Sequence, residues 1–489
     1  MEYNKPLPNI IFFVPDEMRG DTVSLRKNNN PFINTPNIDQ LANDGVAFTN
    51  CFTVNPVCAP SRCCTFTGQY VHSNSHRSLY QLLRPHEENL FKFLKKKGYE
   101  VIWIGRNDLF SQKAGKLSVT KRISLSMLSG DTKELITNMK SNPFKKEDRL
   151  RKSFYYGERT KTQAKDIDYY IIKRGLEYLE TNLNKPFCLY LALGFPHPPY
   201  VVEEPYYSMY NRNEVPAPIP PKLDDKPEFM RLIHERYGLN KLVEEDFREI
   251  LATYYGMITR VDDQFGQILA KLKEIGEYDN SAIFFFSDHG DYAGNYGLTE
   301  KWHNAFQDCL INVPLVMKIP NIQPDEKIKD QLVEIIDIFP TVMEIAQIKS
   351  KYTYFGKNLI PLIKGDDKIH RDAVFAEGGF NIREPQCLES PVKNPNIPLM
   401  GIYYDKTNIS AEKPSTVARS AMIRTKQWKL VIRSSKDEEL YDLIRDPQEL
   451  TNIINDKAYS KIKEELKEKL LRWYLNTSDN AHWKKKREI

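Results

Sequence analysis

PNIIFFVPDE, residues 8–17, sets a run of apolar residues directly before two acids. Three further apolar runs also end in polar residues: YEVIWIG (99–105) precedes Arg106-Asn107-Asp108, KPFCLYLALGF (185–195) precedes Pro196-His197-Pro198, and SAIFFFS (281–287) precedes Asp288-His289-Gly290. Continuous apolar runs of this length are typical of strands that are buried on both faces of a parallel sheet. Ligands of an open α/β sheet bind beyond the carboxyl ends of its strands. We therefore expect the polar residues after all four runs to converge on one site.

Helical spacing of apolar residues separates these runs. It occurs in ENLFKFLKKKGY (88–99), DDQFGQILAKLKEIGEY (262–278) and VEIIDIFPTVMEIAQ (333–347). The alternation predicts an α/β catalytic domain over residues 1–365, with a mostly parallel central sheet flanked by helices. Near residue 365 the pattern changes to short strand-like runs that finish in a charged helix (456–477). This change predicts a small C-terminal α+β subdomain over residues 366–489.

Three stretches are expected to form the loops that carry specificity. Residues 111–165 are rich in lysine and serine and are predicted to be an insertion or a flexible excursion. Residues 201–228 hold many prolines, which predicts an irregular surface loop that borders a cleft. Residues 380–415 are the third stretch.

Composition and charge limit the class of protein. The 489 residues carry 70 lysines and arginines against 65 acids, a net charge of +5 that is spread along the chain, and no nucleic-acid motif occurs. A membrane span needs about 18 consecutive apolar residues. No such stretch occurs in the sequence, which excludes a span. The N-terminal stretch lacks a basic flank and a small-residue cleavage site, which predicts a cytoplasmic location. The seven cysteines, with no zinc-type CxxC pair, argue against a disulfide framework.

Asp16, Glu17 and Asp288 are candidate metal ligands, because carboxylate oxygens are the ligands that Ca²⁺ and Mg²⁺ prefer. His289 is expected to complete the set through nitrogen or to bond to a bound anion. An acid that follows a strand is also a common helix cap, and this alternative holds for any one of them. A buried cluster of acids is costly unless a cation neutralises it, so their co-occurrence favours a metal site.

NPVCAPSRCCTFTG, residues 55–68, is the most specific motif in the chain. Its Cys58-Ala59-Pro60-Ser61-Arg62, followed by Thr67-Gly68, resembles the signature of the type I sulfatases of the alkaline phosphatase superfamily. The resemblance covers most of the chain, through NTPNIDQLANDGVAFTNCFT (34–53), His197-Pro198, SDHGDYAGNYGLTEK (287–301) and ELYDLIRDPQELTNI (439–453). It implies an alkaline-phosphatase-like α/β fold and the hydrolysis of a sulfate monoester, which we expect to be that of a carbohydrate.

The resemblance also implies the chemistry at Cys58. In this family the cysteine is oxidised to formylglycine, so the implied cofactors are this aldehyde and a divalent cation, Ca²⁺ with Mg²⁺ as the alternative. The hydrated aldehyde offers one hydroxyl to attack sulfur and a second whose collapse expels sulfate, whereas a thiol would leave a stable adduct. The cation holds one oxygen of the hydrate, which adds position 58 to the predicted metal ligands.

Four further side chains receive roles from the family's pattern. Arg62 is expected to hold the aldehyde hydrate, because a guanidinium stays charged and offers several donors in one plane. Arg106 and Lys301 are expected to bind the sulfate, and His197 is expected to contact the ester oxygen.

Two positions depart from the family's pattern. Gly105-Arg106-Asn107-Asp108 stands where the family commonly has Gly-Lys-x-His, so Asp108 is predicted to act as a base or to orient Arg106. Glu17 stands where Asp or Gln is usual, and its longer arm is predicted to change the metal contact or to turn outward.

Other residues near these motifs are candidate substrate contacts. They are His303, which follows Lys301 closely, and His72, His76 and Arg77, which follow the signature. For each histidine the alternative is a satisfied hydrogen bond in the packing. Cys63 and Cys64 lie inside the expected signature helix and receive no catalytic role.

A cytoplasmic sulfatase implies that its substrate is imported, so we expect a small sulfated saccharide and not an extended polymer. A formylglycine-generating maturation enzyme is the expected transient partner, and neither nucleic acid nor membrane is expected. One alternative is a phosphonate monoester or phosphodiester hydrolase that uses the same aldehyde, with which the pair Asp288-His289 is compatible. Another is a non-catalytic anion-binding protein that keeps an unmodified thiol.

Overall fold

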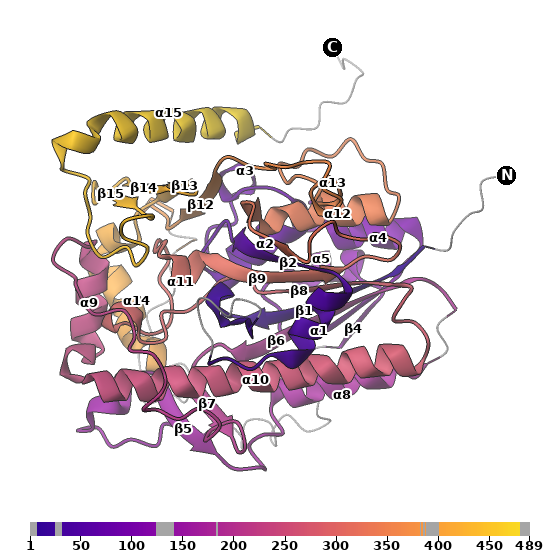
Figure 1. Cartoon of the computed structure of the whole chain (residues 1–489), viewed down its shortest axis with the longest axis horizontal. Helices are drawn as coiled ribbons and strands as arrows, with labels where there is room; N and C mark the ends of the chain where they lie inside the picture. Colours follow the sequence, from indigo (N-terminus) through magenta and orange to yellow (C-terminus); the bar gives the residue numbers. More distant parts are fainter. Residues whose placement is uncertain are drawn as a thin grey trace.

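The computed structural model describes residues 7–24, 32–123, 141–181, 184–381, 383–384, 387 and 401–479. The four apolar runs form four adjacent strands of the main sheet, as predicted: β8 (Ser281–Phe286), β1 (Asn9–Asp16), β6 (Phe187–Pro196) and β3 (Glu100–Gly105). All three pairings among them are parallel. Their carboxyl ends therefore lie at one edge of the sheet, where Figure 1 shows the loops that follow them.

Shorter strands extend the main sheet on both sides of this parallel centre. The sheet runs in the order β10-β2-β9-β8-β1-β6-β3-β4, and β11 also pairs with β2. Their bounds are β2 (Val46–Phe52), β4 (Lys121–Ile123), β9 (Asn312–Lys318), β10 (Ile328–Lys329) and β11 (Val333–Glu334). Strand β9 is antiparallel to both of its neighbours, so the sheet is mostly and not wholly parallel.

Helices cover both faces of the sheet (Figure 1). One face carries α1 (Pro36–Asp44), α8 (Ile167–Leu179) and the long α10 (Glu244–Glu274), and the other carries α2 (Cys58–Thr67), α4 (Leu90–Lys97), α5 (Gln112–Ser118) and α12 (Ile338–Ile345). Successive side chains of a strand point to opposite faces. In β1, Ile11 and Phe13 pack in the α8 and α10 core, whereas Ile10 and Phe12 pack in the core beneath α2, α4 and α12.

Two of the predicted local structures were wrong in part. Residues 333–347 were expected to be helical throughout, but they begin as β11 and a 3-10 turn (Ile335–Asp337) before α12. The described parts of 111–165 are not a flexible excursion: they contain α5, the edge strand β4, a 3-10 turn (Arg149–Lys152) and β5 (Tyr155–Arg159), which pairs with β7 (Tyr200–Glu203). Strand β4 is partly exposed at the sheet edge, so it carries no apolar run that would reveal it. Residues 124–140 lie outside the described residues.

Most of the predicted proline-rich loop 201–228 contains no helix or strand, but its first three residues belong to β7 and its last residue begins α9 (Glu228–Arg236). Short helices complete the connections of the large part: α3 (Val71–Asn74), α9, α11 (Asp308–Ile311) and α13 (Ile360–Ile363), with 3-10 turns at Gly20–Thr22, Leu239–Lys241 and Asn295–Gly297.

A second, antiparallel sheet lies entirely beyond residue 365. It has the order β12 (Val374–Gly378), β13 (Ser420–Arg424), β14 (Trp428–Arg433) and β15 (Glu439–Asp442). The closing helix α15 (Ser460–Thr477) lies along this sheet in Figure 1 and packs on it through Leu466, Leu470 and Trp473. Between β12 and β13 the described chain forms the 3-10 turn Gly401–Tyr403, α14 (Tyr404–Glu412) and the 3-10 turn Pro414–Val417, and the turn Lys457–Tyr459 precedes α15.

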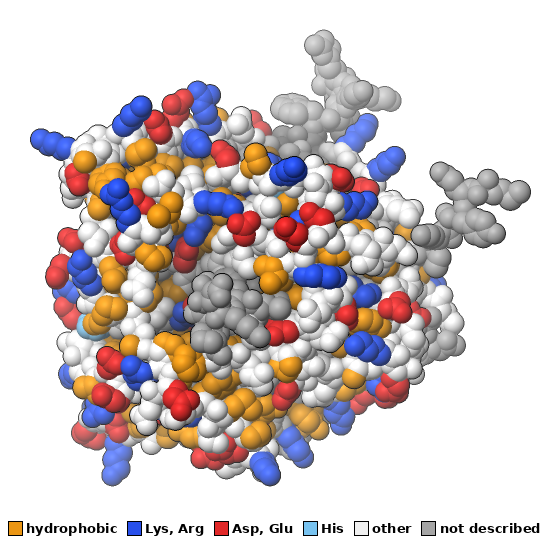
Figure 2. Space-filling view, in the orientation of Figure 1, with side chains coloured by type: hydrophobic (Ala, Val, Ile, Leu, Met, Phe, Trp, Pro, Cys, Tyr) orange, Lys and Arg blue, Asp and Glu red, His pale blue; other side chains and the backbone are white. Residues whose placement is uncertain are grey.

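On the face shown in Figure 2, basic and acidic side chains alternate and form no continuous patch of one sign. Of the helices that the structure describes, none combines the length and the apolar character that a bilayer crossing requires.

Candidate active site

The ends of two central strands and the start of α2 meet at one point. Asp16 ends β1 and Glu17 follows it, Asp288 and His289 follow β8, and Cys58 begins α2. Glu17 has a φ of 70°, an unusual backbone conformation for a residue other than glycine. Its backbone is held from both sides, because its N–H donates to Asp288 Oδ1 at 3.2 Å and its carbonyl accepts from the Tyr254 hydroxyl at 2.7 Å.

Asp16, Cys58, Asp288 and His289 form a buried group whose donor atoms all lie within 4.8 Å of one another. Cys58 Sγ lies 3.3 Å from Asp16 Oδ1 and 3.1 Å from His289 Nε2. His289 Nδ1 lies 2.9 Å from the Gly290 carbonyl, which fixes the hydrogen of the neutral ring on Nδ1 and leaves the Nε2 lone pair facing the group. Burial, assisted by Lys301, lowers the pKa of His289, so the ring stays neutral.

The chemistry of these donors fits a divalent cation. Burial opposes the ionisation of Asp16, but Arg106 and Arg62 hold the pKa of that carboxyl below its usual value, so it offers an anionic oxygen. Carboxylate oxygens and a neutral imidazole nitrogen are groups that divalent cations accept as ligands. Burial, Asp16 and Asp288 raise the pKa of the Cys58 thiol well above its usual value. Without a bound cation, this environment disfavours the thiolate form of Cys58.

Arg62 joins both acids of this group from within α2. Its Nε donates to Asp288 Oδ2 at 2.7 Å, and its Nη2 lies 3.3 Å from Asp16 Oδ2. A third contact, from Nη1 to the Tyr190 hydroxyl at 3.3 Å, fixes the plane of the guanidinium. This fork holds the two carboxylates at a set separation.

Arg106 and Asp108 approach the same group from the end of β3. Arg106 Nη1 lies 2.9 Å from Asp16 Oδ2, and its Nε lies 3.3 Å from Asp108 Oδ2. Both side chains are about a quarter exposed, at 25% and 22%. Asp108 therefore contacts Arg106, and its role as a base or as an orienting residue stays a prediction. The exposed quarter of the Arg106 side chain is accessible to solvent.

Glu17 turns away from the four-residue group and lies in a second one, with His197 and Glu300. Lys301 Nζ donates to Glu17 Oε2 and to Glu300 Oε1, both at 2.7 Å. His197 Nε2 lies 3.5 Å from Glu17 Oε2, and its Nδ1 lies 2.7 Å from the Pro198 carbonyl. Burial, assisted by Lys301, holds the pKa of His197 well below its usual value. The role of Glu17 as a metal ligand stays a prediction.

The candidate substrate contacts lie in packing environments. His76 Nδ1 lies 2.6 Å from the Gln81 carbonyl, and Arg77 lies 3.8 Å from Glu377 and 3.9 Å from Glu384. His72 Nδ1 lies 2.6 Å from Glu377 Oε1 and its Nε2 lies 2.8 Å from Thr477 Oγ1. His303 is 2% exposed, with its ring against Trp302 and Phe380. Their contacts with substrate stay predictions.

Three residues of this site were not predicted. Glu300 lies next to Lys301 within the stretch 287–301, but the family's pattern gave it no role. Tyr403 and Lys406 come from the turn before α14 and from α14 itself, about 100 positions along the chain, so no local pattern links them to Lys301. The Tyr403 hydroxyl lies 3.5 Å from His197 Nε2, and Lys406 Nζ donates to Glu300 Oε2 at 2.8 Å.

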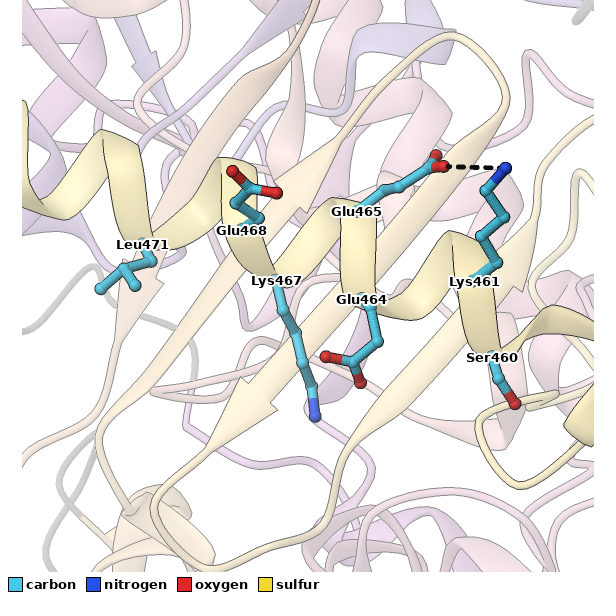
Figure 3. A pocket seen from close by; sticks show the side chains of 7 residues that line it. All are labelled: Ser460, Lys461, Glu464, Glu465, Lys467, Glu468 and Leu471. Atoms are coloured by element: carbon cyan, nitrogen blue, oxygen red, sulfur yellow. Dashed lines mark ion pairs between the residues drawn. The ribbon is translucent and has the colours of Figure 1, made fainter.

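A separate pocket lies along the outer side of α15 (Figure 3). It is lined by Ser460, Lys461, Glu464, Glu465, Lys467, Glu468 and Leu471. Lysines and glutamates alternate there, and one pair, Lys461 and Glu465, lies at 4.0 Å. None of its lining residues belongs to the site at the strand ends.

Comparisons with known proteins match most of the chain. Residues 8–348 match the family model described as Sulfatase, and residues 399–475 match one described as N-sulphoglucosamine sulphohydrolase, C-terminal. The multifunctional alkaline phosphatase superfamily protein PehA of Trinickia caryophylli is 27% identical, over 97% of this chain and 96% of its own. The N-acetylglucosamine-6-O-sulfatase of Bacteroides thetaiotaomicron is 24% identical, over 97% and 87%. The solved phosphonate monoester hydrolase of Agrobacterium radiobacter has a TM-score of 0.73 at 23% identity, with 96% of both chains covered, and it shares the predicted fold.

Proposed function

This chain belongs to the sulfatase family, and on that premise we propose that it hydrolyses the sulfate monoester of a small saccharide. We further propose that Cys58 is oxidised to formylglycine and that a divalent cation, Ca²⁺ or Mg²⁺, binds beside it. The name of the Bacteroides relative supports a carbohydrate substrate. A small saccharide follows from the predicted cytoplasmic location.

The environment of Cys58 is the observation that carries this proposal. Its Sγ faces Asp16 and His289, yet its surroundings raise the pKa of the thiol well above its usual value. Sulfur chemistry there would need a thiolate that burial and the neighbouring acids disfavour. A formylglycine, as its hydrate, supplies a hydroxyl nucleophile and an exit for sulfate.

The cation would be held by Asp16, Asp288, His289 and the modified residue 58. When bound, it supplies Lewis-acid polarisation of the sulfate ester. Arg62 holds the two carboxylates at a fixed separation through contacts of 2.7 and 3.3 Å. The chain therefore provides a preorganised site, in which little reorganisation is needed when the charge of the substrate enters.

The anion would be bound by Lys301, which contacts Glu17, and by Arg106, which contacts Asp16. Arg106 has an open face, because it is 25% exposed, whereas Lys301 is buried. His197 would contact the ester oxygen. Its ring is neutral, and its hydrogen lies on Nδ1 towards the Pro198 carbonyl, so Nε2 accepts a hydrogen bond in the resting state.

The test begins with the mass of the tryptic peptide that contains Cys58, after expression with and without a formylglycine-generating enzyme. We expect a peptide that is lighter by the thiol-to-aldehyde difference, and turnover of an aryl sulfate only in the modified protein. Cys58→Ala should abolish turnover, and Cys64→Ala, a buried cysteine of the same helix, should retain it. An intact thiol with tight sulfate binding and no turnover would favour the anion-binding alternative.

A second candidate function is the hydrolysis of a phosphonate monoester or phosphodiester. The pair Asp288-His289 is compatible with this chemistry, and His289 Nε2 lies 3.1 Å from Cys58 Sγ, where the aldehyde would stand. The two functions are separated by kcat/KM on an aryl sulfate and on an aryl phosphonate ester, measured with one preparation of modified protein. A dominant phosphonate rate would overturn the sulfatase proposal.

A further inference from the structure

Helix α14 brings a lysine from the C-terminal region into contact with the residues around Lys301. Lys406 lies in the first turns of α14, which Figure 1 shows beside α9. Its side chain is 6% exposed although it carries a charge. Its Nζ donates to Glu300 Oε2 at 2.8 Å and to the Lys301 carbonyl at 3.2 Å. A buried lysine is rare unless it is paired, so these contacts define where its charge acts.

Glu300 bridges the two lysines. Its Oε1 accepts from Lys301 Nζ at 2.7 Å, and its Oε2 accepts from Lys406 Nζ and from the Lys301 N–H, both at 2.8 Å. With one lysine alone, this carboxylate would cancel the positive charge of Lys301. The second lysine offsets it. Glu17 also pairs with Lys301 Nζ, at 2.7 Å, so the two lysines and the two carboxylates have no net formal charge with Lys406 present and a net formal charge of −1 without it.

The charge balance matters because the proposed substrate is an anion. A buried carboxylate next to Lys301 repels sulfate and competes with it for the ammonium hydrogens. Lys406 offsets both effects without facing the four-residue group around Cys58, since its polar contacts are with Glu300 and with the backbone of Lys301. The rings of Trp302 and Tyr403, 5.8 and 5.9 Å from Nζ, enclose the ammonium.

We propose that Lys406 is a positioning residue for anion binding: it neutralises Glu300 and so keeps the charge of Lys301 available to the sulfate group of the substrate. This inference rests on the proposed function, in which Lys301 binds sulfate. It adds a contribution of the C-terminal region to the active site. Its effect should lie in binding more than in the chemical step.

The first test compares Lys406→Met, which removes the charge, with Lys406→Arg, which keeps it. We expect Lys406→Met to raise KM for an aryl sulfate and the Kd for inorganic sulfate by about tenfold, equivalent to about 1.4 kcal/mol, with kcat changed much less. Lys406→Arg should recover most of the loss. Lys413→Met removes a lysine at the end of the same helix that pairs with Glu228 at the surface, and both constants should stay unchanged.

The decisive variant is the double substitution Glu300→Gln with Lys406→Met. If Lys406 acts through Glu300, removal of the carboxylate removes the need for the lysine, and the double variant should bind sulfate better than Lys406→Met alone. A purely structural role predicts additive losses, which would overturn the inference. So would an unchanged KM and an unchanged Kd in a folded Lys406→Met protein.

Binding of inorganic sulfate separates a failure of this inference from a failure of the proposed function. Should the wild-type protein hydrolyse a phosphonate ester and not an aryl sulfate, the proposed function fails, and the Kd values still test Lys406. Should it hydrolyse the sulfate while Lys406→Met binds sulfate as the wild type does, only the inference fails.

Discussion

Lys301 and Glu17 form a buried pair in which Nζ lies 2.7 Å from Oε2. The carboxylate that directly follows Asp16 in the sequence thus contacts the proposed anion-binding lysine, outside the group of donors around Cys58. Asp16 and Glu17 are adjacent at the end of one strand, yet their side chains lie in two different groups of residues. The positive φ of Glu17, 70°, separates their directions.

Glu17→Gln tests this division of roles. We expect it to leave the affinity for Ca²⁺ within about threefold of wild type, whereas Asp16→Asn should lower it by at least about tenfold. Isothermal titration of both variants with Ca²⁺ gives the comparison. Equal losses of affinity would show that Glu17 is a metal ligand after all.

Asp108→Asn separates the two predicted roles of that residue. Arg106 keeps its 2.9 Å contact with Asp16 when Asp108 loses its charge, so we expect only a few-fold rise in KM. Arg106→Gln removes a charged donor and should cost about 10- to 100-fold in kcat/KM, from a bond of about 1.5–3 kcal/mol. A large fall in kcat for Asp108→Asn at constant KM would indicate a base.

Removal of the divalent cation should destabilise the fold near Cys58. Without it, Asp16 and Asp288 are two buried carboxylates that share Arg62 as a partner. A cation present at 100 times its Kd adds about 2.7 kcal/mol to the free energy of unfolding, so chelation should lower Tm by several degrees. Ca²⁺ should restore Tm in the wild type but not in Asp16→Asn. An unchanged Tm after chelation would argue against a bound cation.

The pattern of apolar runs was enough to predict the centre of the fold and the place of the site. The four central strands are parallel neighbours, and the residues after them meet because the carboxyl ends of such strands share one edge. The direction of a side chain at that edge was not predictable. Glu17 and Asp16 carry the same chemistry, and only the backbone turn and the position of Lys301 separate them.

Contacts between residues that lie far apart in the sequence could not be predicted either. Lys406 contacts Glu300 through α14, about 100 positions along the chain, and Lys406 belongs to no motif that the sequence reveals. His76 and Arg77 follow the signature closely, but Glu87 and Glu377 decide their surroundings. The edge strand β4 was missed because three partly exposed residues leave no periodic pattern.

His76 should make stability fall as pH rises. Although burial opposes its charge, Cys63 and Glu87 raise the pKa of His76 from 6.5 to about 10. A pKa that is higher in the folded state stabilises fully below pH 6.5, and that stabilisation is lost between pH 6.5 and about 10, at up to about 1.4 kcal/mol per pH unit. The difference in the free energy of unfolding between the wild type and His76→Gln should become smaller as the pH rises through this range. Urea unfolding of both proteins at three pH values measures it. His86→Gln, at an exposed histidine, is the control.

Arg62→Lys tests whether the fork of the guanidinium, and not its charge alone, organises the site. A lysine keeps the charge but cannot span Asp288, Asp16 and the Tyr190 hydroxyl at once, so the two carboxylates should lose their fixed separation. We expect at least about a hundredfold loss of kcat/KM, comparable with the loss of one preorganised donor to a transition state. The Ca²⁺ affinity should fall in parallel.

Arg371→Lys is the matched control for that substitution. Arg371 is also buried and also bridges two acids, Glu334 and Asp337, but it lies outside the groups around Cys58 and Lys301. Its replacement should lower Tm and leave kcat/KM of the folded protein close to wild type. If both variants lose stability equally and keep activity, Arg62 serves packing alone. If only Arg62→Lys loses activity and Ca²⁺ affinity, the geometry of its three contacts is what the reaction requires.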